Sequence, residues 1–125
     1  RLPTYYKESD EYTIIRTFPG LELEGKRYIP LFDYFIDHGH QGAFRIILED
    51  SISVEEGTGI VQTAPAFGEV DFYACQKAGI DPVCPVDNNG NFTSEIPEYQ
   101  GMFVKDADKD IMRCLKQEGK VIHQG

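Results

Sequence analysis

The sequence predicts an α+β domain in which short strands form a mixed, barrel-like sheet beside two main helices. Short β-branched and aromatic runs recur along the chain, separated by turns rich in Gly, Pro and Asn. Two further segments have the apolar spacing of amphipathic helices. The elements fit neither a regular βαβ alternation nor an all-β meander. Because 125 residues suffice for one compact domain, we expect a single domain over residues 1–125.

The strands are predicted by their β-branched and aromatic composition. The clearest runs are 12–17, 43–48 and 58–63. Shorter strands are expected at 21–24, 51–54, 82–86, 91–93 and 121–123. Asn89 and Gly90 form the dipeptide best suited to a type I′ turn, so we expect a hairpin around them.

Both helices are predicted from periodicity and end signals. The first is expected at 68–79, with Glu69 and Asp71 in its first turn, where the helix dipole favours acids. The second begins at Asp106 as N-cap and ends at Gly119. Its apolar stripe comprises Ala107, Ile111, Cys114 and Leu115.

Charge and hydropathy exclude several classes of protein. Twelve basic and 21 acidic residues give a net charge of −9, which argues against a free-standing nucleic-acid binder, since Lys and Arg dominate phosphate binding. Contact with one end of an RNA stays open if another domain supplies the remaining affinity. No apolar run is long enough to span a membrane, and residues 1–8 do not resemble a signal peptide. We expect a cytoplasmic location, no membrane partner and, since the chain lacks an initial Met, a longer parent polypeptide.

The cysteines favour free thiols over a framework of disulfides. Their number is odd and no pair has CxxC spacing, as expected in a reducing compartment. Zinc binding by the cysteines and His123, or by Asp37, His38 and His40, is an alternative. The cysteine spacing does not match common zinc ribbons, and histidines in loops are usually solvated. We therefore expect no metal site. The three cysteines are Cys75, Cys84 and Cys114.

A candidate ligand site lies where the strand at 58–63 leads through a loop into the helix at 68–79. Such a junction presents backbone N–H groups, small residues and a carboxylate in one place. Asp71 could receive an ammonium group of a ligand there. The alternative, which spacing alone favours, is that Asp71 only complements the helix dipole.

Four motifs in register resemble isoleucyl-tRNA synthetases. GTGIVQTAPAFGEVDF at 57–72 resembles their editing-domain motif, usually GTG(I/V)VHxAPAFGxxDY. EGKRYIPLFDYF at 24–35, VDNNGNFT at 86–93 and the segment 101–123, with its VxDAD pattern, match the neighbouring motifs in the expected order. Valyl and leucyl enzymes share a similar GTG…P…D pattern, but APAFG and LFDYF favour the isoleucyl enzyme. The resemblance implies the editing-domain fold that these three families share.

The resemblance also implies a proofreading function. One missing methylene is worth about 1–3 kcal/mol, a limit for which this family is itself the standard example, so the synthetic site rejects valine poorly. The inserted domain hydrolyses mischarged Val-tRNA(Ile). Its implied partners are the misacylated 3′ end of tRNA(Ile) and the rest of the synthetase chain. ATP and Mg belong to the full-length synthetase, and no cofactor is expected in this domain. A non-catalytic module that receives the tRNA end or a protein partner is the alternative.

The family motif assigns roles to residues at matching positions. Asp71 is expected to anchor the α-ammonium group of the substrate by a charge-assisted pair. Gln62 stands where the family usually has His, near the terminal adenosine, and Gln cannot act as a base near neutral pH. We therefore expect water positioned by substrate and backbone groups. The pocket edge and floor are assigned to Gly57, Thr58, Gly59, Thr63, Ala64 and Pro65.

One family element is missing from the sequence. The threonine-rich strand of the form TTxPWTLP has no counterpart in residues 1–19. Since its threonines complete the pocket, we expect the chain to be a partial editing domain that holds one wall of the site. Inactivity of the isolated chain is an open alternative.

Overall fold

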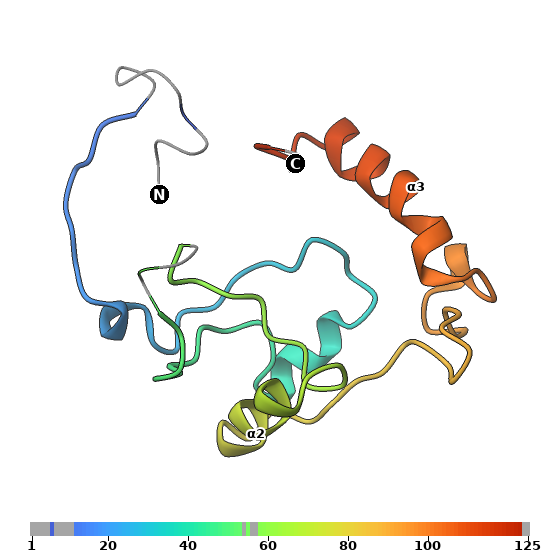
Figure 1. Cartoon of the computed structure of the whole chain (residues 1–125), viewed down its shortest axis with the longest axis horizontal. Helices are drawn as coiled ribbons and strands as arrows, with labels where there is room; N and C mark the ends of the chain where they lie inside the picture. Colours follow the sequence, from blue (N-terminus) through green and yellow to red (C-terminus); the bar gives the residue numbers. More distant parts are fainter. Residues whose placement is uncertain (1–5, 7–11, 54, 56–57, 124–125) are drawn as a thin grey trace.

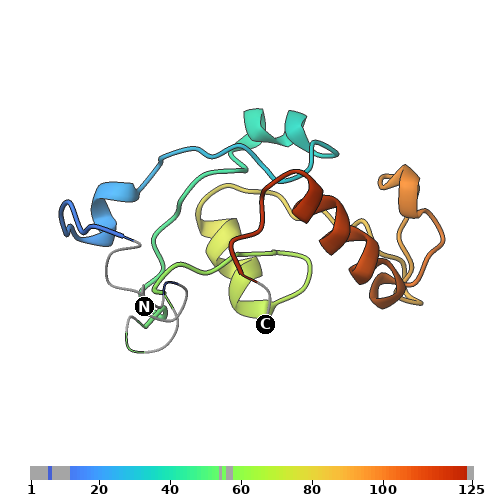
Figure 2. The ribbon, with the colours of Figure 1, turned by 90° about the horizontal axis from the view of Figure 1, so that it is seen from above.

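The structure is a computed structural model and describes residues 6, 12–53, 55 and 58–123. Along the longest axis of the molecule, helix α2 lies between the 3₁₀ helix η1 and helix α3 (Figure 1 and Figure 2). The chain follows an open arc between them. In chain order the elements are η1 (Gly20–Leu23), η2 (Ile36–Gln41), α2 (Glu69–Lys77), η3 (Pro97–Tyr99) and α3 (Val104–Gln117).

Both predicted main helices are confirmed, with one corrected boundary. Helix α2 falls within the expected range, between the extended N-cap Gly68 and Gly79, whose φ of 71° stops the helix. Helix α3 begins earlier than predicted, because its N-cap is Phe103 and not Asp106. An antiparallel bridge with Asn91 holds Phe103 extended, so the helix starts at the next residue. Asp106 lies instead in the first turn, where a carboxylate is also favourable.

The predicted apolar stripe of α3 is confirmed by burial. Ala107 is 0% exposed, and the other three members of the stripe are half-buried. The regular i, i+4, i+7, i+8 spacing places these side chains on one face of the helix. This face is therefore the more buried side of the helix, and the opposite face meets solvent.

The predicted sheet is not confirmed. The described residues contain no β-strand, and backbone pairing is limited to three isolated antiparallel bridges: Arg27–Arg45, Val86–Phe92 and Asn91–Phe103. The segments 12–17 and 58–63 are irregular, and Ile15 is 93% exposed. In the segment 43–48, Phe44 has a φ of 56°, which interrupts an extended run. β-Branched composition favours a half-buried pleated surface, but a strand forms only where a partner satisfies its backbone groups.

Two local predictions are wrong. The segment 21–24 was expected to be a strand, but Gly20–Leu23 is a 3₁₀ helix that follows Pro19, whose N-cap conformation (φ −69°) suits a helix start. The hairpin turn is not type I′, which requires positive φ at both Asn89 and Gly90. Gly90 has a φ of 82°, whereas Phe44 is the sole non-glycine residue with positive φ in the part described. The turn closes through a three-residue loop, with the Asp87 N–H bonded to the Asn91 carbonyl at 2.9 Å.

The fully buried core is small. Within the described ranges it comprises Ala74, Cys75, Ile96 and Ala107. The accessible surface of 10001 Å² is about one and a half times that expected for a compact monomer of 14.2 kDa. Many large apolar side chains are consequently in contact with solvent. None of the helices found among the described residues is both long and apolar enough to cross a membrane.

Candidate functional site: the loop before helix α2

The candidate site begins with a tight turn. The Thr58 hydroxyl donates to the Ile60 carbonyl at 2.9 Å and accepts the Ile60 N–H at 3.2 Å. Gly59 between them has a φ of 75°, which a residue with a side chain rarely adopts. This turn therefore explains why the motif has Thr followed by Gly at these positions. Gly57, the first residue assigned to the pocket edge, lies outside the described residues.

A side-chain hydrogen bond joins the following loop to helix α2. The Ala64 N–H donates to Asp71 Oδ2 at 3.0 Å, and the Phe67 N–H donates to the Ala64 carbonyl at 3.0 Å. The loop is thus folded back onto the first turn of α2. Asp71 holds the loop in this position, because its carboxylate binds a backbone N–H seven residues earlier in the chain.

The Asp71 carboxylate keeps one oxygen free. Asp71 is half-buried, and within the described part of the chain its Oδ1 accepts no hydrogen bond. A carboxylate anchored through one oxygen can bind an ammonium group through the other. Gly68 lies close by: a Cβ atom built on it would be 3.2 Å from Asp71 Oδ2. The glycine therefore leaves room for this carboxylate.

The other residues assigned to the site differ in their burial. Thr63 and Pro65 are half-buried beside Ala64, whereas Gln62 is exposed and has no hydrogen bond to Asp71. The structure therefore brings Ala64 and Asp71 together but does not bring Gln62 to them. Their assigned roles in a reaction stay predictions.

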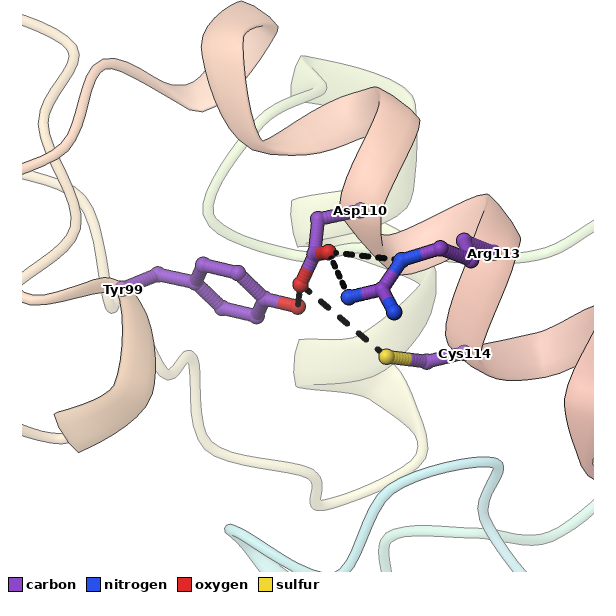
Figure 3. Close-up of polar contacts among 4 residues, drawn as sticks. All are labelled: Tyr99, Asp110, Arg113 and Cys114. Carbon is purple, nitrogen blue, oxygen red and sulfur yellow. Dashed lines mark hydrogen bonds and ion pairs between the residues drawn. The ribbon is translucent and has the colours of Figure 1, made fainter.

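Sequence reasoning missed a second polar cluster, which connects η3 to α3 (Figure 3). The Asp110 carboxylate accepts the Tyr99 O–H at 2.8 Å and the Arg113 Nε–H at 3.0 Å, and a second guanidinium nitrogen of Arg113 also contacts it. These bonds, first that of Arg113 and then that of Tyr99, lower the pKa of Asp110. The Asp110 carboxylate raises the pKa of Tyr99 in return. The i, i+3 spacing of Asp110 and Arg113 was a usable signal, whereas nothing local indicates Tyr99.

The segment around the LFDYF motif lies against the C-terminal half of the chain. Lys120 Nζ donates to the Leu31 carbonyl at 2.8 Å. Burial, followed by a hydrogen bond with Glu98, raises the pKa of Tyr34 to about 12. This motif therefore has a packing role that joins regions far apart in the sequence.

The alternative metal sites would need several ligand side chains close together. Where the structure describes the chain, no three His, Cys, Asp or Glu side chains are grouped to hold a metal ion. The cysteines are free thiols, and Cys75 is buried. The side chain of His40 lies outside the described part, so the candidate with Asp37 and His38 is not tested in full.

Comparison with known proteins identifies the family. No protein-family model matches the chain. The chain is 80% identical over all 125 residues to an isoleucine–tRNA ligase of Protochlamydia amoebophila, of which it covers 12%. It is 51% identical over 124 residues to that of Bdellovibrio bacteriovorus, again covering 12%, and 46% identical over 131 positions to the cytoplasmic enzyme of Mus musculus, covering 10%. The chain thus spans about an eighth or less of these relatives, and over that segment it belongs to the isoleucine–tRNA ligase family.

Proposed function

We propose that this chain is part of the editing domain of an isoleucyl-tRNA synthetase and hydrolyses mischarged Val-tRNA(Ile). The observation that supports this most directly is the hydrogen bond from the Ala64 N–H to Asp71 Oδ2. It joins the two halves of the GTG…APAFG…D motif around a carboxylate with a free oxygen. The proposed partners are the 3′ end of tRNA(Ile) carrying the wrong amino acid and the rest of the synthetase. The proposed location is the cytoplasm, which the name of the mouse relative supports.

Asp71 acts in this proposal by positioning the substrate. Its free oxygen pairs with the α-ammonium group of the esterified valine, which fixes the ester carbonyl relative to a water molecule. The water adds to the carbonyl carbon, the bond to the tRNA oxygen breaks, and the proton passes to that oxygen. The products are valine and tRNA with a free 3′ hydroxyl. Gln62 contributes hydrogen bonds only, because an amide takes up no proton near neutral pH.

The pocket provides selection by size. Thr63, Ala64 and Pro65 have small or compact, half-buried side chains and form the proposed floor, and the Ala64 backbone N–H is bonded to the proposed anchor Asp71. Thr58 and Gly59 form the proposed edge, together with Gly57. A floor of this kind admits valine, and the larger isoleucine is excluded from it.

The proposal extends to the fold. Segments 12–17 and 58–63 have strand composition but form no bridge with any described segment, and their apolar side chains Ile15 and Ile60 are 93% and 69% exposed. Segment 43–48 pairs with residues 25–28 through the isolated Arg27–Arg45 bridge alone. We propose that these three segments pair within the barrel-like sheet of a complete editing domain, with a threonine-rich strand from elsewhere in the synthetase. ATP and Mg act at a separate site of that enzyme.

Deacylation by the complete synthetase tests the proposed function. Val-tRNA(Ile) and Ile-tRNA(Ile) are incubated separately with the enzyme, and the ester remaining is followed over time. We expect the valyl ester to be hydrolysed and the isoleucyl ester to persist. An enzyme that binds both tRNAs and leaves the valyl ester intact would instead be the non-catalytic module, which the Gln62 substitution favours. Gln62→His in the same assay shows whether glutamine has reduced the rate.

A further inference from the structure

Helix α3 has a basic stripe on its solvent face. At about 100° per residue, Lys105, Lys109, Arg113 and Lys116 fall within about 80° of one another around the helix axis. The centre of the stripe lies about 160° around the axis from Ala107, which is fully buried. All four basic side chains are exposed. A third of the 12 basic residues of a chain with net charge −9 thus lie on one face of a single helix.

Two cations of this stripe are not neutralised. Arg113 is paired with Asp110, which also binds Tyr99 (Figure 3). Lys105 lies 3.9 Å from Asp108. Lys109 and Lys116, in contrast, form no ion pair with any residue that the structure describes. They are separated by seven residues, or about 10 Å along the axis, so each can contact a different phosphate.

The surface between these lysines is hollowed. A shallow depression of about 380 Å³ is lined by Lys109, Met112, Arg113, Lys116 and Gln117. Lys116 also lies in the last turn, where a cation complements the helix dipole. The dipole does not account for Lys109, which lies mid-helix, nor for the alignment of both lysines beside one depression.

We infer that the α3 face formed by Lys109, Lys116 and the depression between them binds the phosphate backbone of the tRNA acceptor end. This rests on the proposed function and adds to it a contact outside the hydrolytic site. Charge complementarity selects the partner, because the stripe is cationic on a chain that is otherwise acidic and would repel a polyanion elsewhere. The contact orients the acceptor end and does not read its sequence.

The test compares two charge-matched double variants of the complete synthetase. Lys109→Gln with Lys116→Gln removes the unpaired cations of α3. Lys26→Gln with Lys77→Gln removes two exposed lysines outside α3 and leaves the same net charge. The dissociation constant for deacylated tRNA(Ile) is measured from 50 to 200 mM KCl.

Each lost phosphate contact lowers the slope of log K against log salt by about 0.7–0.9. We expect the α3 variant to lower this slope by about 1.4–1.8, with Kd raised on the order of tens-fold at 0.1 M salt. Lys109→Arg with Lys116→Arg is expected to restore both, because the charge is retained. An α3 variant with the slope and Kd of the wild type would overturn the proposal, as would an equal effect of the control pair. Because the probe is deacylated, failure of Val-tRNA(Ile) hydrolysis would reject the proposed function without deciding this one.

Discussion

Asp71 has two separable roles in the proposed mechanism, and two substitutions distinguish them. Its Oδ2 binds the Ala64 N–H at 3.0 Å, and its Oδ1 is free within the described residues. Asp71→Asn keeps a carbonyl oxygen that can accept the Ala64 N–H but removes the negative charge. Asp71→Ala removes both. If the carboxylate anchors the α-ammonium group, both variants lose deacylation, and only the alanine variant loosens the loop.

The size of each loss follows from the bonds involved. A hydrogen bond to a charged group is worth about 1.5–3 kcal/mol, which corresponds to a fall of about 10- to 150-fold in kcat/KM for Val-tRNA(Ile). In Asp71→Ala the half-buried Ala64 N–H also loses its acceptor, which costs about 1–3 kcal/mol of local stability. Gly68→Ala is the control, because it moves the Asp71 carboxylate without removing its charge. Its Cβ atom would lie 3.2 Å from Oδ2, so the carboxylate must shift by a few tenths of an ångström, and we expect a smaller loss than in either Asp71 variant.

Deacylation kinetics and amide exchange together decide between the roles. The rate is measured with the complete synthetase, and hydrogen–deuterium exchange reports the Ala64 N–H. We expect faster exchange at Ala64 in the alanine variant than in the asparagine variant, with similar rate losses in both. An asparagine variant that deacylates at the wild-type rate would refute the ammonium anchor. Asp71 would then serve only to fix the loop.

Three further outcomes follow from local geometry. Gly90→Ala should destabilise the turn by about 2–4 kcal/mol, measured by exchange of its amides, because φ is 82° and the new Cβ would lie 2.8 Å from the Phe103 ring. Hydrogen bonds from the Asn91 and Asn89 N–H groups lower the pKa of Asp87 from 3.8. The contribution of Asp87 to turn stability is therefore present above pH 3.8 and is lost as the pH falls through the lowered pKa of the folded state. Amide protection of the turn that stays unchanged down to about pH 2 would contradict this. Burial, followed by the nearby Asp71 carboxylate, raises the pKa of the Cys75 thiol, whereas Cys84 is exposed. Iodoacetamide should therefore modify Cys84 before Cys75, and equal rates of modification would contradict the burial of Cys75.

The helices were predictable because their signals are local. The apolar spacing around Ala107, the acids at the start of α2 and the glycine after it all act within a few residues of the element they define. The strand predictions at 12–17 and 58–63 used equally local composition, but a strand exists only where a distant segment pairs with it. Composition does not identify that partner.

The same distinction applies to the candidate site. The motif placed Ala64 and Asp71 in one functional unit, and the structure joins them by a hydrogen bond. The link between Tyr99 and Asp110 spans 11 residues and has no motif, so sequence reasoning did not find it. The exposed position of Gln62 depends on the path of the loop, which its residue type does not determine.

The exposed apolar surface links the candidate site to the unpaired segments of strand composition. Side chains such as Ile15, Ile29 and Ile60 are 93%, 91% and 69% exposed, although burial of each would stabilise the fold by about 1.5–3 kcal/mol. The matched segment is only 12% of the length of the first relatives, so these enzymes contain ample further polypeptide to cover such surfaces. Segment 58–63 contains the proposed floor residue Thr63 and leads directly to Ala64. Pairing of that segment with a neighbouring strand would therefore fix the proposed floor relative to Asp71, and the proposed mechanism needs that fixed floor to distinguish valine from isoleucine.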